Sequence, residues 1–216
     1  MTAQKKNRKL FDLTTIITSV VCLLPILYAL FIYADLPERV VIHWGADGIP
    51  DGWGPKWLAA FGLPIIFCVL NLVCQLVSNA EPRAEARPAV LMAFGRWIIA
   101  IISAVLAPVT LWYAQGREFN PLPFVCCFLG AMMVFVGNYL PKCRRNYTMG
   151  IKLPWTLSSD ENWNRTHRLA GPIWMLTGVI FLVFGLFGWL IPTLVVLLIA
   201  MLIPTIYSYV LHRKGI

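Results

Sequence analysis

Two polar segments of this chain contain the residue types that carry out metal or acid–base chemistry. In the first, His43, Asp47 and Asp51 follow one another at intervals of four residues. One imidazole and two carboxylates could bind a metal ion. However, the glycines and the proline between them exclude the helix that would align the three side chains on one face. We therefore expect no metal in this segment.

The second polar segment contains two serines, two carboxylates and His167. Asp160 and His167 are seven residues apart, which is about 10 Å of helical rise, so they do not meet within one helix. Ser158 and Glu161 have the spacing of a capping box, which predicts the start of a helix. No HExxH, GxSxG or P-loop spacing is present. The sequence thus predicts no catalytic site and no cofactor.

Long apolar stretches surround both segments. Of 216 residues, 59% are hydrophobic and 13% are charged, and the mean hydropathy is +0.71. A transmembrane helix needs about 20 mostly apolar residues, whereas a barrel strand alternates over about 10. The windows of sufficient length cover 11–33, 57–78, 91–113, 122–140, 172–190 and 192–211. The sequence predicts an all-α membrane protein, a bundle of six transmembrane helices within one integral membrane domain spanning residues 1–216.

The distribution of lysine and arginine predicts how this bundle is oriented. Basic residues concentrate in cytoplasmic connections. Fifteen of the 18 lie on one predicted side: Lys5, Lys6, Arg8, Lys9, Arg83, Arg87, Arg96, Lys142, Arg144, Arg145, Lys152, Arg165, Arg168, Arg213 and Lys214. Both termini are therefore predicted to be cytoplasmic, with an exported loop at 34–56 and a cytoplasmic loop at 137–171. The net charge of +8 is a topology signal, and we expect no direct binding of nucleic acid.

The cytoplasmic loop 137–171, called here the signature loop, is expected to contain a short surface helix. This helix begins at Ser158 and runs to about Ala170, and Gly171-Pro172 then turns the chain into the fifth span. In the exported loop, Val40 to Trp44 is β-prone, and turns are expected at Asp47-Gly48 and at Pro50-Asp51-Gly52. A compact turn anchored by tryptophans at the headgroup level and a recognition surface are both consistent with that loop.

Within the spans, few residues are polar. Asp12 and Arg96 lie near the predicted cytoplasmic rims, which argues against an ion-coupled pump. Asn71 and Gln75 share one helix face, which favours polar packing between helices over a substrate site. Four glycines are expected to allow close helix contact: Gly130, Gly137, Gly185 and Gly188.

Two groups of motifs resemble a known family. In the signature loop they are Gly137–Pro141, Asn146-Tyr147, Gly150-Ile151, Pro154–Ser158, Trp163 and Thr166–Gly171. In the exported loop they are Leu36-Pro37, Ile42–Trp44, Gly48, Pro50-Asp51, Trp53-Gly54 and Lys56. The first group resembles the SdpI family of bacterial membrane immunity proteins. The second is similar to the short exported domain of unknown function that often precedes it.

The resemblance implies a multi-pass protein of the bacterial cytoplasmic (inner) membrane that has no enzymatic activity. Such a protein protects against a secreted membrane-active toxin peptide and sequesters a cytoplasmic winged-helix repressor. The implied exported surface, which would meet toxin or membrane lipid, comprises His43, Trp44, Asp51 and Trp53. The implied cytoplasmic surface, which would dock a regulator or shape the bundle, comprises Asn138, Asn146, Tyr147, Trp155, Trp163, His167 and Arg168.

Two alternatives remain open from the sequence. One is a membrane enzyme or carrier that acts on lipid or peptide through His43 or His167. The other is a structural subunit of a membrane complex.

Overall fold

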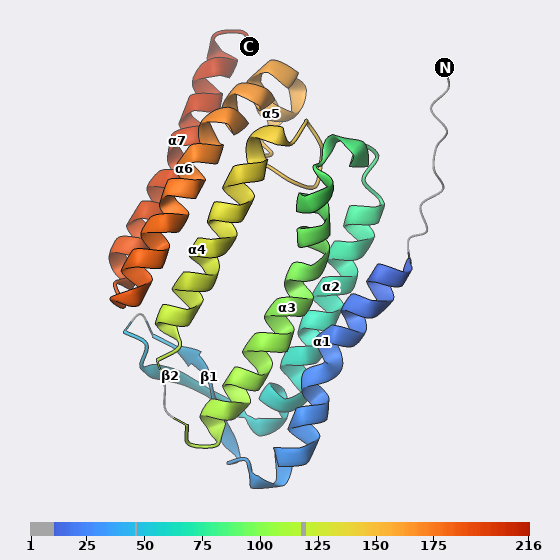
Figure 1. The fold of residues 1–216 in the computed structure, drawn as a ribbon, viewed down its shortest axis with the longest axis vertical. Helices are drawn as coiled ribbons and strands as arrows, with labels where there is room; N and C mark the ends of the chain where they lie inside the picture. Colours follow the sequence, from blue (N-terminus) through green and yellow to red (C-terminus); the bar gives the residue numbers. More distant parts are fainter. Residues whose placement is uncertain (1–10, 46, 118–119) are drawn as a thin grey trace. The chain divides into compact units, whose positions relative to one another are not determined.

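The structure, a computed structural model, describes residues 11–45, 47–117 and 120–216 and is mostly helical (Figure 1). Within these ranges, six helical segments are long and apolar enough to cross a membrane. They contain α1 (Leu13–Ile32), α2 (Leu63–Asn79, together with the helical turn before it), α3 (Ala89–Ala114), α4 (Leu122–Tyr139), α6 (Asp160–Leu186) and α7 (Leu190–Arg213). A short helix, α5 (Pro154–Ser158), lies between the fourth and fifth of them. The predicted fold class is confirmed.

The outward faces of these helices are apolar. Phe31 is 86% exposed, and Leu186 and Ile191 are each more than two-thirds exposed. Such surfaces are unfavourable in water but match the hydrocarbon of a bilayer. The basic N-terminal residues Lys5, Lys6, Arg8 and Lys9, which enter the orientation prediction, lie outside the described residues.

Contacts within the chain divide it into two units. The first comprises residues 11–42, 53–84 and 92–117, and thus contains α1, α2 and most of α3. Its interior is lined by small residues, since Ala29, Ala59 and Ala60 are fully buried beside Leu111. Small side chains let helix backbones approach closely, which is how helices pack where lipid offers no hydrophobic driving force.

The second unit comprises residues 43–52, 85–91 and 120–216, with α4 to α7. Glycines face one another where α4 meets α6. A Cβ atom on Gly178 would lie 2.5 Å from the Gly130 carbonyl oxygen, and one on Gly137 would lie 2.8 Å from that of Gly171. The expected close packing at Gly130 and Gly137 is thus present, and Gly185 packs in the same way on Cys126. Gly188 differs, because a Cβ atom there would meet nothing within 4 Å and because it takes a left-handed φ of 69° just after α6 ends.

Between α1 and α2 the chain forms a hairpin of β1 (Arg39–Trp44) and β2 (Pro50–Pro55). The β-prone run and the turn at Asp47-Gly48 are as expected, with Gly48 at a φ of 77°. The turn expected at Pro50-Asp51-Gly52 is wrong, because these residues begin β2. Proline is tolerated as the first residue of an edge strand, so it does not stop this one. A π-helical turn, Leu58–Gly62, leads into α2.

The fifth span begins earlier than the sequence suggests. Ser159, and not Ser158, caps α6, because its hydroxyl accepts a hydrogen bond from the Asn162 N–H at 3.1 Å. The helix then continues through Gly171 and Pro172 to Leu186 without a break. Pro172 leaves only the carbonyl of Arg168 without its helical donor, and packing against α4 at Gly171 holds the helix together there.

Candidate functional site

The signature loop is organised around a buried pair of rings on α6. Trp163 and His167 are both fully buried, and their rings stack with centroids 4.0 Å apart. They lie one helical turn apart, so α6 itself sets their contact. The Trp163 indole N–H donates to the Cys143 carbonyl at 2.7 Å, which fixes the chain that leaves α4.

Both imidazole nitrogens of His167 are engaged. Nε2 accepts a hydrogen bond from the Ile151 N–H at 3.0 Å. Because that nitrogen is an acceptor, the ring proton lies on Nδ1, which is 2.8 Å from the Trp163 carbonyl oxygen and donates to it. The ring is therefore neutral, and its two hydrogen bonds connect the loop to α6. A catalytic role for His167 would require breaking one of these two bonds.

Asn146 shapes the loop from within. It is fully buried, and its amide oxygen accepts hydrogen bonds from the backbone N–H groups of Thr148 at 3.0 Å and Met149 at 2.7 Å. Its amide nitrogen donates to the Arg144 carbonyl at 2.9 Å. One side chain thus satisfies three backbone groups that no helix or strand pairs.

Gly150 closes the loop over the ring pair. Its φ of 113° lies in a region that side-chain-bearing residues avoid. A Cβ atom there would lie 2.5 Å from His167 Nε2 and 2.9 Å from the Trp163 ring. The Gly150-Ile151 motif therefore serves the packing of the loop.

A second set of contacts ties the loop to α7. The Trp155 indole N–H donates to the Ser208 hydroxyl at 2.9 Å, and the Asn162 amide donates to the Ser208 carbonyl at 2.9 Å. Asn162 is fully buried, although sequence reasoning does not select it. Its position directly before Trp163 on the helix is the available signal.

The remaining predicted cytoplasmic residues lie at the surface: Asn138, Tyr147 and Arg168 are exposed. The sequence leaves two roles open for this group, docking a regulator or shaping the bundle. Asn146, Trp163 and His167 are fully buried, so their side chains contact other parts of the loop and α6. The exposed residues are the ones that a partner can reach.

On the hairpin, the structure brings together two of the predicted residues. His43 Nδ1 lies 2.5 Å from the Asp51 carboxylate, with side chains 71% and 53% exposed. Asp47 does not join them, because its carboxylate accepts a hydrogen bond from the Ile49 N–H at 2.9 Å and so stabilises the turn. Within the described residues, no three His, Cys, Asp or Glu side chains are grouped as a metal site would require.

The hairpin also exposes aromatic and apolar surface. Trp53 and Trp57 are about half exposed, while Trp44 is partly buried. A pocket of about 470 Å³ beside the turn is lined by Asp51, Ile49 and, from the start of α7, Ile191. A polar pair next to apolar surface is how binding patches are commonly built.

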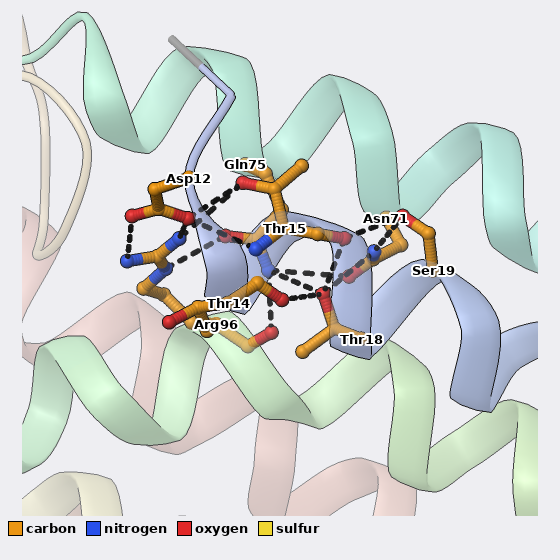
Figure 2. Close-up of polar contacts among 8 residues, drawn as sticks. All are labelled: Asp12, Thr14, Thr15, Thr18, Ser19, Asn71, Gln75 and Arg96. Carbon is orange, nitrogen blue, oxygen red and sulfur yellow. Dashed lines mark hydrogen bonds and ion pairs between the residues drawn. The ribbon is translucent and has the colours of Figure 1, made fainter. Parts of the chain in front are cut away.

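A third polar cluster links α1, α2 and α3 in the first unit (Figure 2). The guanidinium of Arg96, on α3, forms a two-pronged ion pair with Asp12, the N-cap of α1. Its Nε donates to the Gln75 side-chain oxygen at 2.7 Å, so the same group also binds α2. Hydrogen bonds from Arg96 hold the pKa of the Asp12 carboxyl well below its ordinary value of 3.8, against a smaller opposing effect of burial.

Asn71 and Gln75 continue this cluster away from the ion pair. Both amides donate to the Thr18 hydroxyl, at 3.0 and 3.1 Å. The Gln75 amide also donates to the Arg96 carbonyl at 2.7 Å. These bonds join neighbouring helices, as the interpretation of polar packing expected, and they engage both polar atoms of the Gln75 side chain.

The molecule is thus a multi-pass membrane protein whose two polar connections are ordered by buried tryptophan, histidine and asparagine in one case and by a β-hairpin in the other. Residues 142–208 match the SdpI/YfhL protein family, and residues 20–68 match a domain of unknown function, DUF1648. These matches confirm the resemblance to the SdpI/YfhL family in the second half of the chain and to the short domain of unknown function in the first.

Among known proteins, the chain is similar to Immunity protein SdpI of Bacillus subtilis, with 25% identity over 202 residues that cover 92% of this chain and 96% of that protein. It is also similar to the Man(5)GlcNAc(2)-PP-dolichol translocation protein RFT1 of Yarrowia lipolytica, with 27% identity over 160 residues. That match covers 73% of this chain but 21% of that protein. No solved structure matches the chain.

Proposed function

We propose that this protein is an immunity and signalling protein of the bacterial cytoplasmic membrane that protects its cell against a secreted membrane-active peptide. The observation that carries the proposal is the similarity to Immunity protein SdpI along nearly the whole of both chains. The arrangement of the hairpin supports it, because this connection presents an imidazole, a carboxylate and an indole to solvent.

The hairpin is the proposed contact surface for the peptide. His43 and Asp51 form an exposed polar pair, and the adjoining pocket includes the apolar side chains of Ile49 and Ile191. A membrane-active peptide is amphipathic and therefore needs both kinds of contact. The exposed indole of Trp53 provides further apolar area of the kind that anchors binding partners.

The exposed residues of the signature loop are the proposed docking surface for a cytoplasmic winged-helix repressor. Tyr147 is 51% exposed, and the buried Asn146 next to it holds the surrounding backbone in place. A rigid exposed aromatic residue is a typical anchor at protein interfaces.

Survival of a toxin-sensitive bacterium tests the immunity proposal. Cells that produce the protein should survive higher concentrations of a secreted membrane-active peptide than cells that carry an empty vector. The double variant His43→Ala, Asp51→Ala should lose this protection at an unchanged level of membrane-inserted protein. Glu38→Gln serves as the matched control, because Glu38 is exposed just before β1 and lies outside the proposed surface.

Unchanged killing by several such peptides would overturn the proposal. If the double variant still protects cells, His43 and Asp51 are not part of the surface that contacts the peptide. For the regulator, a tagged winged-helix repressor from the same cell should sediment with membranes that contain the protein. Less repressor should sediment with membranes that contain the Tyr147→Ala variant. Equal sedimentation with and without the protein would exclude the proposed docking of a repressor.

A further inference from the structure

Basic side chains converge on one hollow in the second unit. A pocket of about 480 Å³ lies between the end of α4 and the first turns of α6, and it is lined by Lys142, Arg144, Arg145, Asp160 and Arg168, among others. This volume lies within the usual range of small-ligand sites. The two helix ends lie side by side near α5 in Figure 1.

The pocket carries excess positive charge. Arg145 is neutralised by Asp160, whose carboxylate lies 2.7 Å from its Nε. Lys142, Arg144 and Arg168 are exposed, and in the described part of the chain none of them has a carboxylate within 4.0 Å. Charge in a cytoplasmic connection is expected from topology alone. Its convergence on one hollow is not, and it produces a concentrated positive potential there.

The framework of this pocket is fixed. Arg144 donates its backbone N–H to the Ala86 carbonyl at 2.8 Å, and the Cys143 carbonyl is held by the Trp163 indole. Arg145 also donates to the Leu157 carbonyl at 2.8 Å. An anion would therefore meet donors on a backbone that is already in place, so little ordering entropy opposes binding.

An exposed apolar stripe on α6 leads away from the pocket. Met175, Val179 and Leu186 follow Arg168 by 7, 11 and 18 residues, which is close to two, three and five full turns, so all four share one face. The three apolar side chains are 36%, 48% and 71% exposed. A cationic pocket at the end of a membrane span, continued by an apolar track, fits a molecule with a charged head and a hydrocarbon tail.

We propose that this pocket binds the phosphate of an anionic phospholipid, with the acyl chain along the stripe below Arg168. Lys142, Arg144 and Arg168 would donate charge-assisted hydrogen bonds to the phosphate oxygens. Basic pockets on the cytoplasmic side of membrane helices are suited to such headgroups. The site requires no toxin and no repressor, so it is independent of the proposed immunity function.

Native mass spectrometry of the purified full-length protein in mild detergent tests this proposal. With equal amounts of phosphatidylglycerol and phosphatidylcholine added, the protein should retain phosphatidylglycerol preferentially. Arg168→Gln should weaken that retention about tenfold, the effect of losing one charge-assisted hydrogen bond. Arg165→Gln is the matched control. It removes the same charge three residues before Arg168, but the Arg165 side chain pairs with Glu161 and does not line the pocket.

Three results would overturn the proposal: no preference for phosphatidylglycerol, equal loss in both variants, or full retention in Arg168→Gln. A further experiment measures the thermal stability of the protein with inorganic phosphate in place of lipid. Thermal stabilisation by phosphate alone that matches that of phosphatidylglycerol would keep the anion site but assign it to free phosphate. Stabilisation by the lipid alone supports the acyl track as well as the headgroup site.

Discussion

Asp12 and Arg96 are 84 residues apart in the chain, yet Arg96 binds both oxygens of the Asp12 carboxylate. The two side chains are 36% and 15% exposed, so the pair lies at the edge of the helix packing and is not sealed within it. Since Arg96 also binds Gln75, one guanidinium connects α1, α2 and α3. An ionisable residue in a span is usually a functional site. Here, however, the contacts of Arg96 hold three helices together.

Removal of either partner of this pair should destabilise the first unit. Asp12→Asn leaves a largely buried guanidinium without its counter-charge. We expect a loss of about 1–2 kcal/mol, below the cost for fully buried pairs because Asp12 is partly solvated. Thermal unfolding in detergent measures this. The double variant Asp12→Asn, Arg96→Gln should cost less than the sum of the single variants, because the two changes remove the same interaction.

Glu38→Gln is the control for this prediction. Glu38 pairs with Lys56 at 2.9 Å but is 87% exposed, and exposed pairs contribute little. Its unfolding temperature should therefore stay close to that of the unchanged protein. A loss as large as that of Asp12→Asn would mean that burial does not determine the strength of these pairs.

The Asp12 carboxylate should also make stability depend on pH at the acidic end only. Its pKa is lowered in the folded protein by the hydrogen bonds from Arg96. A lowered pKa gives stabilisation that is complete above the ordinary value of 3.8 and is lost as the pH falls through the folded value. The difference in unfolding temperature between the protein and Asp12→Asn should therefore be constant from about pH 5 to pH 8 and shrink below that range. A difference that vanishes near neutral pH would contradict the assignment.

His167 should act on stability and not on chemistry. His167→Phe preserves a ring beside Trp163 but leaves the partly buried Ile151 N–H without its acceptor, which costs about 1–2 kcal/mol. His167→Gln offers an oxygen to that N–H and should be less harmful. Protection of cells by the two variants should follow their amounts of folded protein in the membrane. Full folding of His167→Phe with complete loss of protection would instead point to a direct role of the imidazole.

The sequence predicts the helical spans well because each is a local property, a run of about 20 apolar residues. The β-prone run at Val40 and the turn at Gly48 are local in the same sense. The continuity of α6 does not depend on local sequence alone. Gly171-Pro172 is a local signal for a break, but the tight packing of Gly171 on α4 keeps the helix continuous.

The roles of the candidate residues depend on contacts between distant segments, which periodicity does not reveal. His167 and Trp163 have types that suit binding or catalysis, and only the position of the Ile151 N–H shows that the imidazole is already engaged. The sequence places Asp12 and Arg96 each at a rim of the membrane. Their pairing follows from the packing of α1 against α3, for which no residue pattern in either helix is a signal.

Gly150 gives the sharpest test of the signature loop, because another glycine in the chain also has a positive φ but has different surroundings. Gly150 and Gly116 both have positive φ, at 113° and 84°, but a Cβ atom added at Gly116 would have nothing within 4 Å. Alanine at either position costs about 1–2 kcal/mol for the backbone conformation. At Gly150 it must also displace His167, which is fully buried and cannot move away without breaking its bond to Ile151. Gly150→Ala should thus cost about 2 kcal/mol more than Gly116→Ala. Thermal unfolding measures that difference. Hydrogen exchange of the Ile151 amide should be faster in Gly150→Ala and unchanged in Gly116→Ala, which would locate the effect in the loop. Equal effects of the two variants would show that the loop does not depend on the packing of Gly150 against Trp163 and His167.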